Sequence, residues 1–154
     1  MAGRIDQRLA DLGITLPTPA APIANYVPFV VTGNLVVISG QIPLVDGKVA
    51  FTGKVTEDIT PEHAKEGARA CFVNLLAQLK AATGDLDRVK RVVRLGGFIA
   101  APGTFTGHAA VMNGASDLAV EVFGDAGRHA RSTIGVPSLP ADAAVEVEGL
   151  FEIA

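Results

Sequence analysis

The fold is decided by two stretches near the end of the chain, Arg131-Ser132-Thr133-Ile134-Gly135-Val136-Pro137 and Val145-Glu146-Val147-Glu148. The first predicts a strand over about 132–137 that starts beside a cation and ends in a turn bounded by prolines. In the second, alternation places the two glutamates on one face of a returning strand and the two valines on the other. A guanidinium and a carboxylate are thereby predicted to meet across two neighbouring strands, which suits a small anionic substrate attacked by water.

The remaining elements are predicted from periodicity and from turn residues. A helix over 4–12 and an extended connector rich in proline and alanine precede strands at 26–31, 35–40 and 48–51, the second of them buried on both faces. Thr60 before Pro61 is typical of a helix start and Gly84 of a helix end, so a long helix is expected to run to about Thr83. A strand at 89–100, a helix at 109–123 and a last strand at 144–153 complete the prediction.

The order of these elements predicts an α+β fold, in which two helices lie on one face of a mixed β-sheet. One domain is expected to span residues 1–154, because this length is typical of a single domain and 49% of the residues are hydrophobic. The strands are too apolar to leave the other sheet face in water. We therefore expect copies of the chain to pack sheet against sheet in a closed homo-oligomer.

Charge and composition narrow the classes of partner. A net charge of −3 and a pI near 5.5 provide no basic surface for phosphate backbones, which argues against nucleic acid and favours a small ligand or a protein. The start of the chain lacks the apolar region of a signal peptide, and no apolar run reaches the roughly 20 residues of a membrane span. With Cys71 as its one cysteine, the chain is predicted to be cytoplasmic and to have no internal disulfide.

Arg131 is the first candidate for binding a substrate, because a planar guanidinium offers two parallel donors to a carboxylate. The alternative is a structural ion pair with Glu146 or Glu148. Glu146 is the candidate for activating a water, provided that its surroundings keep it ionised or sharing a proton. Its alternative role is that of a solvated strand residue.

Ser39, Tyr26 and Asn113 are further candidates, which offer two hydroxyls and an amide. Each has an ordinary alternative: the serine satisfies a turn, the tyrosine packs, and the asparagine caps a helix.

The sequence contains no pattern that predicts a metal site. The three histidines have no metal-ligand spacing with one another or with Cys71, which falls on the apolar stripe of a helix and is most simply a core residue. These histidines are His63, His108 and His129. A glycine-rich phosphate loop, a nucleophile elbow and a Ser/His/Asp set are also missing from the sequence.

Three blocks of the sequence follow one another in a recognisable order: Ser39-Gly40-Gln41-Ile42-Pro43, then Arg131-Ser132, then Leu139-Pro140 through Val145-Glu146-Val147-Glu148. The combination, with a helix between the first two blocks, resembles the YjgF-type family of reactive intermediate (imine/enamine) deaminases. The resemblance covers the chain from about Tyr26 to the C-terminus. It implies a chorismate-mutase-like fold and a homotrimer with clefts between its subunits.

The resemblance also implies roles for individual residues. Arg131 matches the family arginine that grips the substrate carboxylate, and Glu146 matches the glutamate that positions or activates the hydrolytic water. Tyr26, Ser39 and Asn113 match residues of the pocket.

The reaction implied is attack of water on the C=N carbon of a 2-imino acid formed from its enamine tautomer, which yields a 2-keto acid and ammonia. No cofactor is needed, and the expected partner is a small metabolite that carries a carboxylate. Thr133, assigned to substrate binding, stands where many family members carry a cysteine. Thiol chemistry is thereby lost, but an arginine and an activated water suffice for hydrolysis.

Two other functions stay open at this point. A non-catalytic trimer that binds a small carboxylate or acts as a chaperone is suggested by Thr133 and by the segments that depart from the family pattern, such as the helix over 4–12. RNA cleavage is attached to the names of some relatives, but the acidic balance and the lack of a catalytic histidine pair argue against it.

Overall fold

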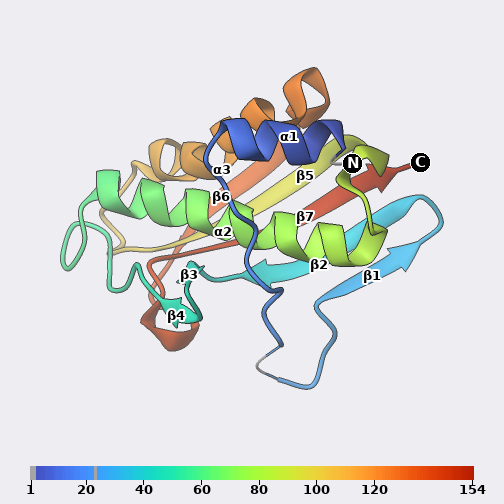
Figure 1. The fold of residues 1–154 in the computed structure, drawn as a ribbon. Helices are drawn as coiled ribbons and strands as arrows, with labels where there is room; N and C mark the ends of the chain where they lie inside the picture. Colours follow the sequence, from blue (N-terminus) through green and yellow to red (C-terminus); the bar gives the residue numbers. More distant parts are fainter. Residues whose placement is uncertain (1–2, 23) are drawn as a thin grey trace.

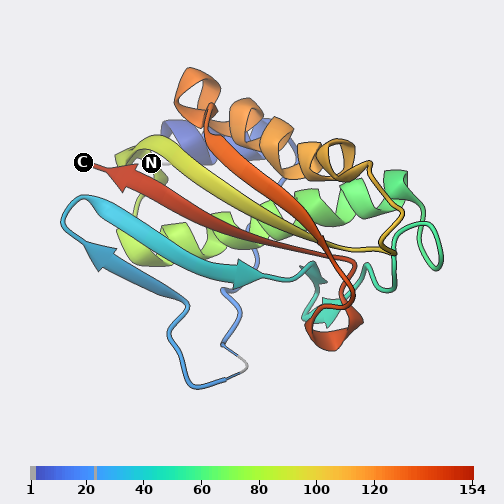
Figure 2. The same cartoon turned by 180° about the vertical axis from the view of Figure 1, so that it is seen from behind.

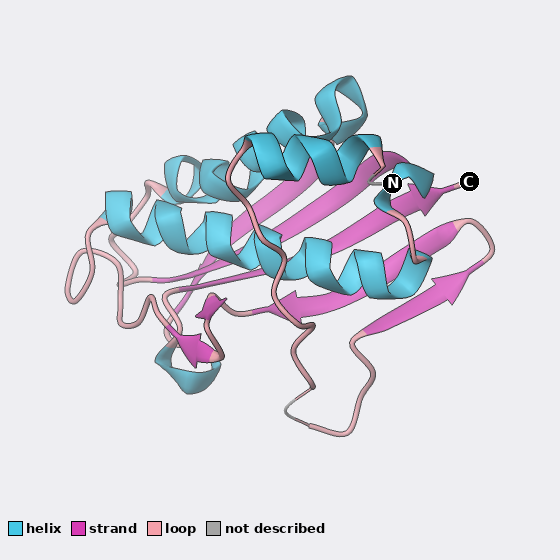
Figure 3. Ribbon diagram, in the orientation of Figure 1, coloured by secondary structure: helices cyan, strands magenta, loops and turns pink. Residues whose placement is uncertain are grey.

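The computed structural model describes residues 3–22 and 24–154. A five-stranded mixed sheet carries helices α2 and α3 on one face, and a shorter helix, α1, packs against α3 (Figure 1; Figure 3). The predicted fold class is therefore confirmed. In chain order the elements are α1 (Arg4–Asp11), β1 (Phe29–Thr32), β2 (Leu35–Gln41), β3 (Leu44–Val45), β4 (Lys48–Val49), α2 (Pro61–Thr83), η1 (Leu86–Arg88), β5 (Val89–Ala100), α3 (His108–Phe123), η2 (Gly124–Gly127), β6 (Ala130–Val136), η3 (Pro140–Asp142) and β7 (Val145–Ile153).

The five strands lie in the order β1-β2-β7-β5-β6, and β3 and β4 form a separate small hairpin. Neighbours in the large sheet are antiparallel except β5 and β6, which are parallel. Parallel strands require a crossover connection, and α3 supplies it. The last strand of the chain therefore lies at the centre of the sheet, whereas β6 lies at one edge (Figure 2).

Helix α2 begins and ends where local chemistry predicts. The Thr60 hydroxyl oxygen accepts a hydrogen bond from the backbone N–H of His63 at 3.1 Å, and Pro61 occupies the first helical position. At the other end Gly84 has a φ of 76°, a left-handed conformation that glycine adopts without steric cost.

Replacing Thr60 with alanine is expected to lower the free energy of unfolding by about 1 kcal/mol, because the His63 N–H loses its acceptor. Urea unfolding followed by circular dichroism measures the difference. Thr60→Ser keeps the hydroxyl and serves as the matched control. An equal loss in both variants would contradict the capping role.

Strand β7 alternates as predicted. Val145 and Val147 are fully buried, and a Cβ added at Gly67 of α2 would stand 3.2 Å from Val145 Cγ1, so α2 packs directly on this strand. Glu146 and Glu148 are partly buried and project from the opposite face of the sheet.

Three strand predictions in the first third of the chain are wrong in detail. The first strand begins at Phe29 and not at Tyr26, because the segment bends before Pro28, which has no N–H for a sheet partner. Strand β2 is buried on one face only, since Val37 is 45% exposed between two buried neighbours. Strand β4 is shorter than the predicted range 48–51, since it covers only Lys48–Val49.

Helix α1 is tied to the rest of the fold at its N-terminus. The Asp87 carboxylate accepts hydrogen bonds from the backbone N–H groups of Arg4 and Ile5, at 2.9 and 2.8 Å. The bonds to Ile5 and then Arg4 lower the pKa of Asp87, since they favour its charged form. The connector after α1 then crosses α2, where Gln78 Nε2 donates to the carbonyl oxygen of Ala20 at 2.8 Å (Figure 1). This bond places the connector beside the end of β2.

None of the described helices covers the other face of the sheet (Figure 2). Val30, Val37 and Ile134 on that face are 45 to 52% exposed, and Arg94 and Glu148 lie among them as an ion pair at 3.7 Å. Exposed aliphatic side chains on a sheet face are typical of a surface that packs against another protein. Within the described ranges, no helix combines the length and the apolar character needed to cross a membrane.

Candidate functional site

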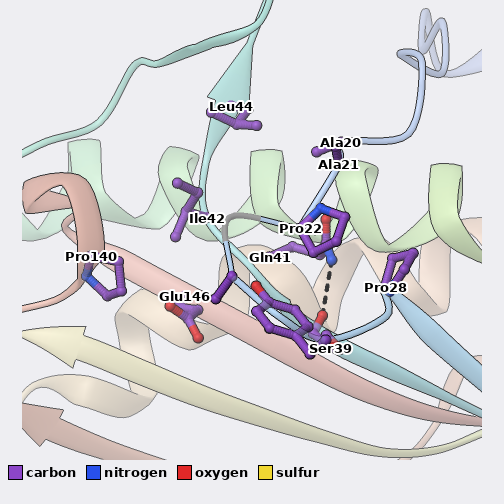
Figure 4. Close-up of a pocket in the computed structure, with 13 residues that line it drawn as sticks. Ala20, Ala21, Pro22, Pro28, Ser39, Gln41, Ile42, Leu44, Pro140 and Glu146 are labelled. Carbon is purple, nitrogen blue, oxygen red and sulfur yellow. Dashed lines mark hydrogen bonds between the residues drawn. The ribbon is translucent and has the colours of Figure 1, made fainter.

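A cavity of about 420 Å³ opens where the connector passes the end of β2 (Figure 4). Three of the residues predicted from the sequence line it: Tyr26, Ser39 and Glu146. The other walls are mostly apolar, with alanines and prolines of the connector on one side and Ile42, Leu44 and Pro140 elsewhere. The structure therefore offers a small apolar chamber with a few polar groups, a composition typical of ligand sites.

Glu146 is the one ionisable carboxyl of this lining. Burial raises its pKa above the usual range of a glutamate, and the negative charge of Glu148 raises it further. Gly40 makes room for the side chain, since a Cβ at that position would overlap the Glu146 carboxylate. A carboxyl with a raised pKa in a cavity is suited to taking up and releasing a proton.

Ser39 and Tyr26 are linked through the backbone. The Ser39 hydroxyl donates to the carbonyl oxygen of Val27 at 2.8 Å, and Tyr26 in the same bend is 46% exposed. The ordinary alternative for the serine, a turn contact, is thus what the structure contains. Its hydroxyl oxygen retains lone pairs that accept from a ligand.

Three amide side chains that the sequence analysis did not select hold the cavity walls. Asn74 Nδ2 donates to the carbonyl oxygens of Ile42 and Leu44, at 3.1 Å each, and Gln78 holds the connector. Gln41 Nε2 donates to the carbonyl oxygen of Ser39 at 2.9 Å (Figure 4). The signal available in the sequence was two amides, Asn74 and Gln78, placed four residues apart in the middle of an apolar helix. The structure buries both of them.

The Arg131 guanidinium lies against α3. Its Nη1 donates to Asn113 Oδ1 at 2.8 Å and to Ser116 Oγ at 3.0 Å, and its Nη2 donates to the carbonyl oxygen of Ala109 at 3.2 Å. These bonds use three of its five N–H groups. The Nε–H and one Nη2–H have no acceptor among the described residues, and all three acceptors are neutral. Arg131 thus retains both its charge and two donors for an anion.

The structure also decides between the alternatives for Arg131 and Asn113. Within the described part of the chain, Arg131 forms no ion pair with Glu146 or Glu148, and Glu148 pairs with Arg94 instead. Asn113 does not cap α3, whose N-cap residue is Gly107.

Thr133 follows Arg131 on the same side of β6. Its hydroxyl oxygen is inaccessible to solvent and has no hydrogen-bond partner among the described residues. A buried hydroxyl without a partner costs free energy, so such a group in a native fold calls for an explanation. For a ligand beside Arg131 to become this partner, the Thr133 side chain must rotate, because its hydroxyl oxygen is closed to solvent in this conformation.

The sequence pattern of the family described as "YjgF/chorismate mutase-like, putative endoribonuclease" matches residues 6–152. The chain belongs to this family. Protein TCP17 of Trypanosoma cruzi is 46% identical over 153 residues, which are 99% of this chain and 96% of that protein. The 2-iminobutanoate/2-iminopropanoate deaminase of Dermatophagoides farinae is 32% identical over 140 residues, 91% of this chain and 94% of that protein.

A solved structure confirms the fold. The crystal structure of protein Atu1372 from Agrobacterium tumefaciens, whose function is unknown, superposes with a TM-score of 0.91 at 47% identity. The match covers 97% of this chain and 92% of that protein.

The residues that the YjgF resemblance selected fall into two groups in this chain. Tyr26, Ser39 and Glu146 line the cavity, whereas Asn113, Arg131 and Thr133 lie on α3 and the helix side of β6. Arg131 and Glu146 project from opposite faces of the sheet, and strand β5 separates β6 from β7. The prediction that they meet across neighbouring strands is therefore wrong, because the parallel crossover places β6 beside β5.

Proposed function

We propose that this protein hydrolyses reactive 2-imino acids, formed from their enamine tautomers, to 2-keto acids and ammonia in clefts between the subunits of a homotrimer. The observation that carries the proposal is the Arg131 guanidinium, which keeps its charge and two donors for a carboxylate. Membership of the YjgF family and the 32% identity to a 2-iminobutanoate/2-iminopropanoate deaminase support the reaction class.

The two groups of residues complete one another chemically. Arg131 and Thr133 supply donors for a carboxylate, and Glu146 supplies a proton acceptor inside a cavity. One chain presents them on opposite faces of its sheet, so a complete site takes Arg131 from one subunit and Glu146 from the next. The edge position of β6 and the exposed aliphatic residues of the open sheet face support an arrangement of this kind.

In the proposed mechanism, Arg131 binds the carboxylate of the imino acid through its Nε–H and Nη2–H, and the Thr133 hydroxyl donates to the same group after its side chain rotates toward the site. Glu146, ionised, takes a proton from a water as the water oxygen adds to the C=N carbon. Glu146 passes this proton to the imine nitrogen, which becomes an amine. The new hydroxyl group then gives its remaining proton to Glu146, which transfers it to the amine. The C–N bond breaks, ammonia leaves, the C–O bond becomes the carbonyl of the keto acid, and Glu146 is ionised again. The chain's own side chains carry each step, and no cofactor takes part.

Ammonia release tests the proposal. An amino-acid oxidase or a dehydratase generates imino acids in situ, and the purified protein is expected to accelerate their hydrolysis in proportion to its concentration. No acceleration with several aliphatic imino acids would overturn the proposal. If 2-oxobutanoate nonetheless stabilised the fold, the non-catalytic carboxylate-binding function would take its place.

Replacing Gly40 with alanine is expected to slow imine hydrolysis by about tenfold or more, because the new Cβ displaces the Glu146 carboxylate from the cavity. The flexible end of a side chain moves easily, so the melting temperature changes little. Kinetics and thermal unfolding of the same sample measure the two effects. Gly103→Ala is the matched control, since a Cβ there meets no atom within 4 Å. Unchanged kinetics in Gly40→Ala would contradict the role of the Glu146 carboxylate.

A further inference from the structure

The hydrogen bonds that hold Arg131 continue beyond the residues used in the proposed reaction. Ser116 Oγ lies 3.0 Å from Arg131 Nη1 and 2.8 Å from His129 Nε2. His129 Nδ1 in turn lies 2.6 Å from the carbonyl oxygen of Gly127. These contacts form one relay, which runs from the Arg131 guanidinium through the Ser116 hydroxyl and the His129 imidazole to the Gly127 oxygen. No step of the proposed reaction uses Ser116, His129 or Gly127.

The direction of each hydrogen bond in this relay follows from its two terminal groups, the Gly127 carbonyl oxygen and the Arg131 guanidinium. The Gly127 oxygen only accepts, so His129 Nδ1 carries the proton and donates it. In a neutral ring Nε2 then accepts, and the single O–H of Ser116 donates to it. The lone pairs of Ser116 are left facing Arg131 Nη1. The imidazole therefore orients the serine hydroxyl as an acceptor for the guanidinium.

The far end of the relay is fixed to the helix that holds Arg131. Gly127 is buried in η2, and a Cβ there would overlap the carbonyl oxygen of Ala119 in α3. The backbone of η2 therefore lies directly on α3, the helix that also supplies Asn113 and Ser116. Helix α3 therefore holds both ends of the relay: it binds the Arg131 guanidinium directly, and Gly127 packs on it. This arrangement leaves the guanidinium little freedom to rotate.

We propose that Ser116 and His129 are positioning residues for the substrate carboxylate, a role that rests on the proposed function of Arg131. They hold the guanidinium in the orientation that leaves its Nε–H and one Nη2–H free, and they touch no substrate themselves. The acceptors on Asn113 and Ala109 each hold one N–H, on Nη1 and on Nη2. The relay holds the second N–H of Nη1 and so strengthens this orientation of the group.

Amide replacements separate the two nitrogens of His129. Glutamine places its amide where Nε2 lies, so His129→Gln keeps an acceptor for Ser116. Asparagine places its amide where Nδ1 lies, so His129→Asn keeps the bond to Gly127 and loses Ser116. If His129 served only to anchor its loop, the bond to Gly127 would be the one that matters. If His129 acts through the relay, the contact with Ser116 is the one that matters.

We expect Ser116→Ala and His129→Asn each to raise KM for the imino acid about tenfold with kcat within about threefold, because carboxylate binding weakens equally in the ground and transition states. His129→Gln is expected to stay within about threefold of the wild-type KM. The double variant Ser116→Ala/His129→Asn should be no worse than Ser116→Ala, because the histidine acts through the serine. His63→Asn, at an exposed histidine outside the relay, is the control.

The opposite ranking, with His129→Asn like wild type and His129→Gln impaired, would overturn the proposal in favour of loop anchoring. An unchanged KM in Ser116→Ala would also overturn it. Calorimetric binding of 2-oxobutanoate to the same variants separates this inference from the proposed function. If the wild type binds the keto acid but hydrolyses no imine, the same ranking in affinity supports the relay and equal affinities overturn it. A wild type that binds no carboxylate overturns both.

Discussion

Replacing Arg131 with alanine is expected to lower kcat/KM for imine hydrolysis by at least about 100-fold, or about 2.7 kcal/mol of transition-state stabilisation. Alanine removes both the charge and the two donors that the structure leaves for a carboxylate. Its other three hydrogen bonds go to neutral groups, so Arg131 is not needed to neutralise a buried acid. Steady-state ammonia release over a range of imino-acid concentrations measures the loss.

Arg131→Lys is the informative companion. It keeps the positive charge but offers a point donor in place of the planar pair, so an intermediate loss is expected, mostly in KM. A folded Arg131→Ala protein within about threefold of the wild-type kcat/KM would show that another group binds the carboxylate.

Replacing Glu146 with glutamine is expected to lower kcat by about 100-fold, because glutamine has the same shape but takes no proton from water. The pH dependence follows from the raised pKa of Glu146. Below that pKa the carboxyl is protonated and inactive as a base, so wild-type kcat/KM rises with pH as it ionises. The midpoint is expected above the usual range of a glutamate, and the variant should show no such rise. A rise of equal size in the variant would contradict the assignment.

The raised pKa of Glu146 also affects the free energy of unfolding in a defined direction. Glu146 holds its proton more tightly in the folded than in the unfolded state, so its contribution to stability falls as the pH rises from the unfolded-state pKa through the folded-state pKa. Glutamine carries no charge to desolvate. Glu146→Gln is therefore expected to unfold at higher urea concentration than the wild type at neutral pH, with a smaller difference in acid. A glutamine variant less stable than the wild type at neutral pH would mean that the ionised carboxylate stabilises the fold.

The elements that the sequence predicted well are those whose ends depend on a few adjacent residues. The capping threonine, the proline after it and Gly84 define α2 without reference to the rest of the fold. The strand at Val89–Ala100 was recognisable from its β-branched content. The alternation in β7 was equally local and correctly placed Glu146 and Glu148 together on the face opposite to Val145 and Val147.

Sequence reasoning failed where the answer depends on distant contacts. Strand β5 lies between β6 and β7 because of a crossover connection, and no residue near Arg131 or Glu146 predicts this order. The cavity wall formed by the connector depends on the Gln78 bond to Ala20, across 58 residues of sequence. The YjgF resemblance selected Asn113, which local pattern suggested as a cap. Neither approach found Ser116 or the use of His129, since their hydrogen bonds form only once α3 packs on β6.

Mixed oligomers of two inactive variants test directly whether Arg131 and Glu146 of different chains share one site. Arg131→Ala and Glu146→Gln chains with different affinity tags are unfolded together, refolded, and purified over both tags. In a ring of three, every mixed trimer has one complete site, so we predict about one third of the wild-type activity although each parent is inactive. Doubly tagged oligomers that stay as inactive as their parents would contradict a site shared between subunits.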